Sequence, residues 1–203
     1  MSLEESKTSI YGDKYPEMEK VMMKACEIIN GFRKEEEEAT GEDPVEHLSY
    51  RIKTEESMRE KCRRRNLEEN ERSALKVLTD AIGIRIVCPF RSDVYLLKDK
   101  IEQSGAFEIV EQKDYIKHAK ENGYRSFHMI VRFEGFFIEI QLRTISMDTW
   151  AALEHQMKYK KQVNGNLELI SSELKRCADS LASTDISMQT LRDLIRQMDD
   201  IES

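Results

Sequence analysis

Hydrophobic and polar positions follow two different periods along the chain, and these separate helical ends from a strand-rich centre. Apolar side chains between residues 14 and 39 recur at intervals of three and four, which is the period of an amphipathic helix. Apolar and polar residues alternate instead between residues 82 and 88, which predicts a strand that ends at Pro89. The other predicted strands are 107–114, 124–133 and 136–143, and the other predicted helices are 45–70, 70–80, 92–104, 145–160 and 166–201.

This order of elements predicts an α+β fold, in which a small mixed or antiparallel sheet is flanked by helices. Glu134–Gly135 is predicted to join the last two strands as a hairpin, and the final helix is predicted to be broken or loosened near residues 183–185. We divide the chain into an N-terminal helical segment (1–44), a core (45–160) and a C-terminal helical segment (161–203).

Composition and charge exclude several classes of protein. Of the 203 residues, 39% are hydrophobic and 35% are charged, which is too apolar for a disordered chain and too charged for a membrane protein. The first 13 residues lack the apolar stretch of a signal peptide, and the four cysteines lack zinc-ligand spacing, so we expect a cytoplasmic protein with reduced thiols. The net charge of −7 conceals a basic centre between acidic ends. That distribution favours a local anion site over a surface for duplex DNA.

A row of cations in the segment 51–65 is the first candidate for chemistry. Lys53, Ser57, Lys61 and Arg64 are spaced so that a helix would place them on one face. Three cations and a hydroxyl on one face suit a polyphosphate, because several donors then meet adjacent anionic oxygens. A solvated basic face, paired with neighbouring glutamates, would explain the same spacing.

Two carboxylates are associated with the predicted strands. Asp80 precedes the strand 82–88, and Glu139 lies within the strand 136–143, on the polar side with Gln141 and Arg143. An acid within so apolar a strand is costly unless it is paired or binds a cation. Two acids from neighbouring strands are suitable ligands for Mg²⁺, whereas ion pairs of Glu139 with Arg85 or Arg143 are the structural alternative.

The segment 114–128, DYIKHAKENGYRSFH, is the third candidate. Asn122–Gly123 predicts a turn that delivers Tyr124 to the start of a strand. A tyrosine at this point can stack on a nucleobase while neighbouring basic side chains meet phosphates, although a loop with an anchoring aromatic is the simpler explanation. Neither GxxxxGK[ST] nor GxGxxG occurs in the chain, which excludes P-loop and Rossmann sites.

Four ordered blocks together resemble the RelA/SpoT synthetase family, whose members make the alarmones pppGpp and ppGpp. The resemblance covers residues 45–160. It rests on R-I-K-x₃-S-x₃-K-x₂-R (51–64), D-x₂-G-I-R-I-V (80–87), D-Y-I-K-x₂-K-x-N-G-Y-R-S-x-H (114–128) and E-I-Q-L-R-T-x₂-M-x₂-W-A-x₂-E-H-x₃-Y-K (139–160). It implies a stand-alone small alarmone synthetase whose core sheet is similar to that of nucleotidyltransferases.

The resemblance also implies a reaction and a set of site residues. The 3′-hydroxyl of GDP or GTP would attack the β-phosphorus of ATP, accept pyrophosphate and release AMP. Asp80 and Glu139 would be the catalytic residues and would hold Mg²⁺. The implied ATP-binding residues are Arg51, Lys53, Ser57, Lys61, Arg64 and Arg85. The implied residues for the guanine nucleotide are Tyr124, which would stack on the base, and Lys113, Lys117, Lys120, Asn122, Arg125, His128 and Gln141.

Two other functions remain open at the level of sequence. One is a toxic variant that pyrophosphorylates adenine nucleotides or RNA 3′ ends, because Tyr124 can stack on any base. The other is a non-catalytic oligomer that binds nucleotides or single-stranded RNA, with no membrane partner. The apolar positions of the terminal helices predict a homo-oligomer, and the size of the small relatives' assemblies favours a tetramer.

Overall fold

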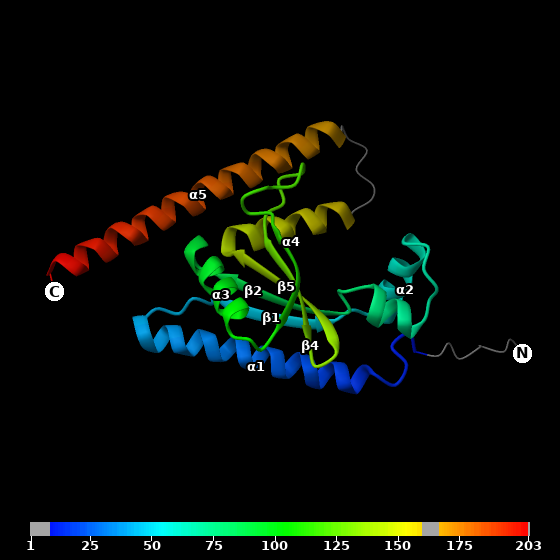
Figure 1. Ribbon diagram of the computed structural model, residues 1–203. Helices are drawn as coiled ribbons and strands as arrows, with labels where there is room; N and C mark the ends of the chain where they lie inside the picture. The colour runs from blue at the N-terminus through cyan, green and yellow to red at the C-terminus, as the bar shows by residue number, and fades with distance from the viewer. Residues whose placement is uncertain (1–8, 160–166, 203) are drawn as a thin grey trace, which may run out of the picture.

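A computed structural model describes residues 9–159 and 167–202 (Figure 1). A five-stranded sheet forms the centre, and α-helices flank it. The helices are α1 (Tyr15–Thr40), α2 (Glu55–Arg64), α3 (Arg91–Gln103), α4 (Ile145–Tyr159) and α5 (Leu167–Glu202), with a short π-helix, η1 (Ser73–Val77). The strands are β1 (His47–Ile52), β2 (Ile82–Cys88), β3 (Glu108–Asp114), β4 (Phe127–Phe133) and β5 (Phe136–Thr144).

The sheet has the strand order β1-β2-β5-β4-β3 and is mixed. Strands β2 and β5 are parallel neighbours at its centre, while the other three pairs are antiparallel. The hairpin between β4 and β5 turns at Glu134–Gly135, and both residues have positive φ, as a tight two-residue turn requires. The predicted α+β class with a small mixed sheet is therefore confirmed.

Alternation along β2 and β5 divides the sheet into an apolar face and a polar face. Ile84 and Ile140 are paired on the apolar face, where both are buried in the main hydrophobic core. Helices α1 and α3 contribute to that core, α1 through residues such as Met18 and Ile29. The polar side chains of the two central strands point to the opposite face, which leaves that face available for a binding site.

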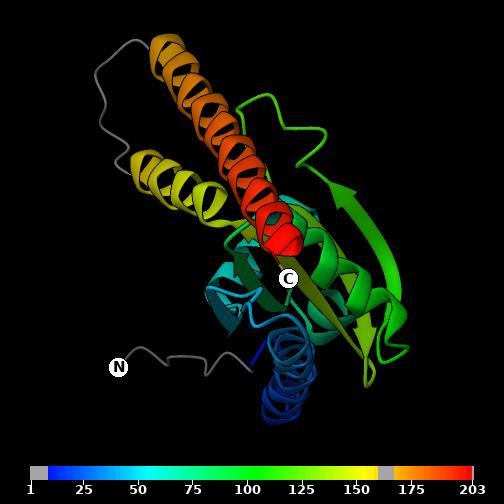
Figure 2. The same ribbon diagram turned by 90° about the vertical axis from the view of Figure 1, so that its left-hand side faces the viewer.

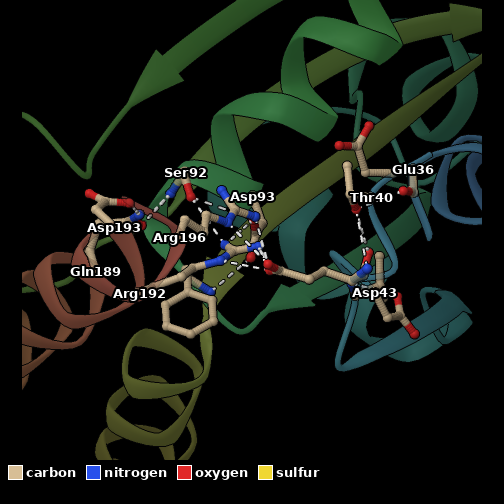
Figure 3. Close-up of polar contacts among 12 residues, drawn as sticks. Glu36, Thr40, Asp43, Ser92, Asp93, Gln189, Arg192, Asp193 and Arg196 are labelled. Atoms are coloured by element: carbon tan, nitrogen blue, oxygen red, sulfur yellow. Dashed lines mark hydrogen bonds and ion pairs between the residues drawn. The ribbon is translucent and has the colours of Figure 1, made fainter. Parts of the chain in front are cut away.

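The C-terminal helix α5 packs over α4 and reaches across to α3 (Figures 1 and 2). Trp150 of α4 donates a hydrogen bond from Nε1 to the carbonyl of Leu174 at 2.8 Å. Further along α5, the buried Arg192 lies over the Phe90 ring and donates a hydrogen bond to Asp93 at 2.5 Å (Figure 3). Polar contacts thus attach both halves of this helix to the rest of the fold.

The prediction of one helix over 45–70 is wrong. Residues 47–52 instead form the edge strand β1, which pairs with β2, and α2 begins only after Thr54. The Thr54 hydroxyl caps α2 by accepting a hydrogen bond from the Ser57 backbone N–H. Because most positions of β1 are exposed, its hydrophobic alternation is too weak to compete with the surrounding charged pattern.

Two smaller predictions also differ from the structure. Helix α5 is continuous through residues 183–185, where Asp185 turns inward and accepts a hydrogen bond from Thr144 at 2.5 Å and the Thr184 hydroxyl donates to the Ser180 carbonyl. Strand β4 begins at Phe127, so Tyr124 lies in the preceding loop and not in the strand. In the described ranges, no helix combines the length and the apolarity needed to cross a membrane.

Candidate active site

The register of the sheet aligns polar residues of all five strands in one row. Ser49 of β1 pairs with Arg85 of β2, and Arg85 pairs with Gln141 of β5. Gln141 in turn pairs with His128 of β4, which pairs with Lys113 of β3. Because paired residues in a sheet share a face, residues from distant parts of the sequence meet on the polar face.

A cavity of about 160 Å³ opens above this row, between β1, β2 and β5. Its walls include Arg51, Arg85 and Gln141, and Glu139 lies at one side. Gly83 pairs with Arg51 on one side and Glu139 on the other, and it has no side chain to fill the space between them. The two arginines that the resemblance assigns to ATP therefore share one cavity with the candidate catalytic carboxylate.

Asp80 lies just before β2 and is held by two lysines. Lys53 donates a short hydrogen bond to Oδ2, and the Lys61 ammonium lies 2.6 Å from the same oxygen. Burial acts to raise the pKa of Asp80, but the two lysines outweigh it and hold that pKa below its ordinary value. The other oxygen, Oδ1, is buried and has no hydrogen-bond partner among the described residues.

Glu139 occupies the middle of β5, with its side chain 25% exposed. His128 Nδ1 lies 3.6 Å from Oε1, and Gln141 Nε2 donates to Oε2 at 2.9 Å. Burial and the charge of Asp80 act to raise the pKa of Glu139, whereas His128 and Gln141 lower it, and the net pKa lies below the ordinary value. Among the described residues, the basic side chain that contacts Glu139 is thus His128 and not Arg85 or Arg143.

The two carboxylates are of the chemical type that binds Mg²⁺. Asp80 offers a buried oxygen without a hydrogen-bond partner in the described part of the chain, and its charge is close enough to affect the pKa of Glu139. No group of three or more His, Cys, Asp or Glu side chains suited to a metal occurs in residues 9–159 and 167–202. Two carboxylates without a full protein cage are typical of Mg²⁺ bound together with a nucleotide.

A closed ring of polar contacts connects Glu139 to Tyr124. Arg143 donates from Nη2 to the Tyr124 hydroxyl at 2.6 Å and to Gln141 Oε1 at 2.9 Å. The Tyr124 hydroxyl lies 2.8 Å from His128 Nε2. Since arginine only donates, the tyrosine proton is free for Nε2 of a neutral His128 ring, and Nδ1–H then faces Glu139. The candidate stacking tyrosine and the candidate base therefore belong to one hydrogen-bond network.

The loop between β3 and β4 carries five of the predicted acceptor residues, the other three lie in strands, and several of the eight have intramolecular partners. The Lys120 ammonium lies 4.5 Å from the Tyr115 ring centre and 4.9 Å from that of Tyr124. Arg125 donates to Asp179 of α5 at 2.9 Å, and Asn122 donates to Glu154 of α4 at 3.2 Å. Lys113 and Lys117 pair with the exposed Glu111 and with Asp114.

The predicted cation row is only partly a helix face. Lys53 lies between β1 and α2, and it reaches Asp80 from the strand end and not from a helical turn. Lys61 approaches the same carboxylate from α2. Ser57 and Arg64 are exposed on α2, where the Ser57 hydroxyl accepts a hydrogen bond from Thr54 at 2.9 Å. The structure thus brings together the two lysines nearest the carboxylate.

Sequence reasoning missed the roles of two residues. Arg143 appeared only as a neighbour or ion-pair partner of Glu139, yet it is buried and bonds Tyr124, Gln141 and Asp148. Asp148 was not considered, although its carboxylate also lies 3.4 Å from Arg85. An acid in the first turn of a helix is ordinary, so its sequence position carried no signal.

Comparison with known proteins gives consistent results. The family model described as "Region found in RelA / SpoT proteins" matches residues 50–164. GTP pyrophosphokinase YjbM of Bacillus subtilis is 31% identical over 178 residues, which covers 83% of this chain and 82% of that protein. GTP pyrophosphokinase YwaC of the same organism is 39% identical over 147 residues, covering 68% and 70% of the two chains.

Solved structures share the whole architecture. Small alarmone synthetase 1 from Bacillus subtilis, bound to its product pppGpp, superimposes with a TM-score of 0.78 at 29% identity, covering 90% of this chain and 96% of that one. A GTP pyrophosphokinase family protein from Streptococcus pneumoniae gives a TM-score of 0.77 at 30% identity, covering 92% and 96%. From the family match, these relatives and the shared fold, we conclude that the chain belongs to the RelA/SpoT family.

Proposed function

We propose that this protein is a GTP pyrophosphokinase that transfers the β,γ-pyrophosphate of ATP to the 3′-hydroxyl of GDP or GTP, making (p)ppGpp and AMP. The observation that carries the proposal is the position of Glu139: it lines an arginine-lined cavity, feels the charge of Asp80 and is connected to Tyr124 through His128. The relatives named as GTP pyrophosphokinases, and the neighbour bound to pppGpp, support it.

The donor nucleotide would occupy the cavity between β1, β2 and β5. Arg51 and Arg85 would hold the adenine there, since guanidinium groups stack on flat aromatic rings. Lys53 and Lys61 would exchange part of their contact with Asp80 for the donor phosphates, with Ser57 and Arg64 further along α2. Cations placed in advance offset the charge that develops on the transferred group.

The acceptor would approach from the loop between β3 and β4. Tyr124 would stack on guanine, and the basic side chains of that loop, with Asn122, His128 and Gln141, would orient the nucleotide. Glu139 is the candidate base: its pKa lies below the ordinary value, so it is ionised at neutral pH and can accept the 3′-hydroxyl proton. Holding both substrates in this geometry removes much of the entropic barrier of a two-substrate reaction.

Asp80 and Glu139 would hold Mg²⁺ together with the donor phosphates. When bound, the cation supplies charge neutralisation at the donor phosphates. The chain itself contributes the unpartnered Asp80 oxygen and keeps Glu139 in place through His128 and Gln141.

We also propose that the active species is a homotetramer in the cytoplasm, where both nucleotides are available. The second half of α5 docks through polar residues such as Asp185 and Arg192, while its apolar residues are exposed. A second copy of the chain is the simplest cover for such a stripe. The exposed apolar side chains are Met188, Leu191, Leu194, Ile195 and Met198.

A nucleotide panel tests the proposed function. Purified protein is incubated with ATP and Mg²⁺ plus GDP, GTP, GMP, additional ATP or a short single-stranded RNA, and the products are separated by anion-exchange chromatography. The proposal predicts AMP and a 3′-pyrophosphorylated product with GDP or GTP. Product only with adenine nucleotides or RNA, or binding without any turnover, would contradict it.

A further inference from the structure

Asp148 is a carboxylate in the first turn of α4 that meets two arginines from different strands. Arg143 of β5 donates from Nη1 to Oδ1 at 3.0 Å, and Arg85 Nη1 of β2 lies 3.4 Å from the same oxygen. His47 Nε2 lies 4.0 Å from the other oxygen, Oδ2. The Asp148 side chain is 19% exposed and that of Arg143 only 5%, so this pair is largely shielded from water, whereas Arg85 is 38% exposed.

The two arginines lead to different halves of the site. Arg85 lines the donor cavity, and its Nε is buried without a hydrogen-bond partner in the part of the chain that the structure describes. Arg143 lies on the acceptor side, where it donates to the Tyr124 hydroxyl and its guanidinium carbon lies 5.2 Å from the centre of the Tyr124 ring. One carboxylate thus connects the donor and acceptor sides.

Charge explains why these arginines need Asp148. Burial and the positive charge of Arg143 both lower the pKa of Arg85, whereas Asp148 raises it, so the two guanidinium groups repel each other and the carboxylate offsets the repulsion. Repulsion between like charges is stronger where water is excluded. Without the carboxylate, the arginines would move apart, and each would leave its place beside a nucleotide.

We propose that Asp148 is a positioning residue for both nucleotides: it holds Arg85 for the donor base and, through Arg143, holds Tyr124 for the acceptor base. This inference rests on the proposed function. It goes further by identifying one carboxylate, outside both predicted sets of binding residues, that adjusts the two substrate sites together.

Steady-state kinetics of Asp148→Asn test the proposal. We expect the KM for ATP and the KM for GDP each to rise at least fivefold, with kcat reduced by less than threefold. Asp148→Glu retains the charge and is expected to restore both KM values to within about twofold of wild type. A rise in only one KM, or in neither, would overturn the proposal.

The matched control is Asp93→Asn, which removes the carboxylate of another buried pair, with Arg192 (Figure 3). Neither residue lines the nucleotide cavity. It is expected to lower the melting temperature while leaving both KM values within twofold of wild type. If Asp93→Asn raised both KM values as Asp148→Asn does, the effect would be general destabilisation, and the proposal would fall.

A double variant separates the effect of Asp148 on the donor site from its effect on the acceptor site. Arg85→Ala is expected to raise the KM for ATP alone, and adding Asp148→Asn to it should then raise only the KM for GDP. If Asp148→Asn does not fold, Arg143→Lys tests the effect on the acceptor site, because lysine cannot reach both Asp148 and Tyr124. An unchanged KM for GDP in that variant would overturn the proposal. If the wild-type protein synthesised no alarmone, the proposed function itself would be refuted. That result is distinct from failure of the Asp148 proposal, in which wild type is active and the variants do not behave as expected.

Discussion

Replacing Glu139 by glutamine removes one charge and one proton acceptor while it preserves the shape of the side chain. In the structure, Gln141 donates to one carboxylate oxygen at 2.9 Å, and a glutamine carbonyl at position 139 can accept that same bond. The His128 ring, 3.6 Å away, then faces an uncharged amide in place of a carboxylate. Because the charge of Asp80 acts against ionisation of Glu139, the substitution also relieves a repulsion.

These contacts set the expected magnitudes. The loss of one charge-assisted contact costs about 1.5–3 kcal/mol, and the relief of repulsion from Asp80 offsets part of it, so the folded protein should persist. Loss of a general base typically lowers the rate by about 10²–10⁴-fold. The smaller figure corresponds to about 2.7 kcal/mol in the activation free energy. Loss of an anionic ligand for Mg²⁺ adds to this, so we expect synthesis to fall at least a hundredfold.

The assay compares wild type and Glu139→Gln under one set of conditions. Melting temperature establishes that the variant is folded, calorimetry with a non-hydrolysable ATP analogue establishes donor binding, and chromatography of ATP with GDP and Mg²⁺ measures synthesis. A well-folded Glu139→Gln protein that still synthesises at more than a tenth of the wild-type rate would remove Glu139 from the mechanism. A variant with lower stability and normal turnover would identify Glu139 as a structural residue.

Three further predictions follow from the same structure. Tyr124→Ala removes the stacking surface, which is worth about 1–3 kcal/mol per base. The KM for the guanine nucleotide should therefore rise about ten- to a hundredfold while the KM for ATP stays within twofold. Equal losses for both nucleotides would refute the stacking role. Arg192→Met leaves the buried Asp93 without its cation, which costs about 3–5 kcal/mol, so the melting temperature should fall by about 6–20 °C in a thermal scan. An unchanged value would refute a stabilising role for the pair. Light scattering at micromolar concentration should give the mass of a tetramer, and a monomer would contradict the assigned role of the exposed α5 stripe.

Strands with one buried face were readable from the sequence, and an exposed edge strand was not. Alternation in β2 and β5 is strong because every second side chain enters the core, and this also identified Glu139 as a polar residue in an apolar strand. In β1, side chains on both faces of the strand are largely exposed, so its hydrophobic pattern resembled that of the charged helix that follows. The capping contact of Thr54 was the local signal that separated the two elements.

Residues that act through tertiary contacts were beyond the reach of the sequence pattern. Asp80, Glu139 and Tyr124 were identified by their residue types and motifs, and the fold places Asp80 and Glu139 near each other. The pairing of Asp148 with Arg85, across 63 positions of sequence, depends on where α4 packs against the sheet. The attachment of Arg125 to Asp179 likewise depends on the path of α5, which no local period encodes.

The fate of the labelled phosphates tests the central claim most directly. The protein is incubated with Mg²⁺, GDP and ATP labelled at the β-phosphorus, and the products are separated and examined by ³¹P NMR and mass spectrometry. Direct attack on the β-phosphorus predicts one AMP for each ppGpp, with the label in a pyrophosphate on the 3′-oxygen of guanosine. Formation of ADP with transfer of a single phosphoryl group, or release of free pyrophosphate without a guanosine product, would contradict the account.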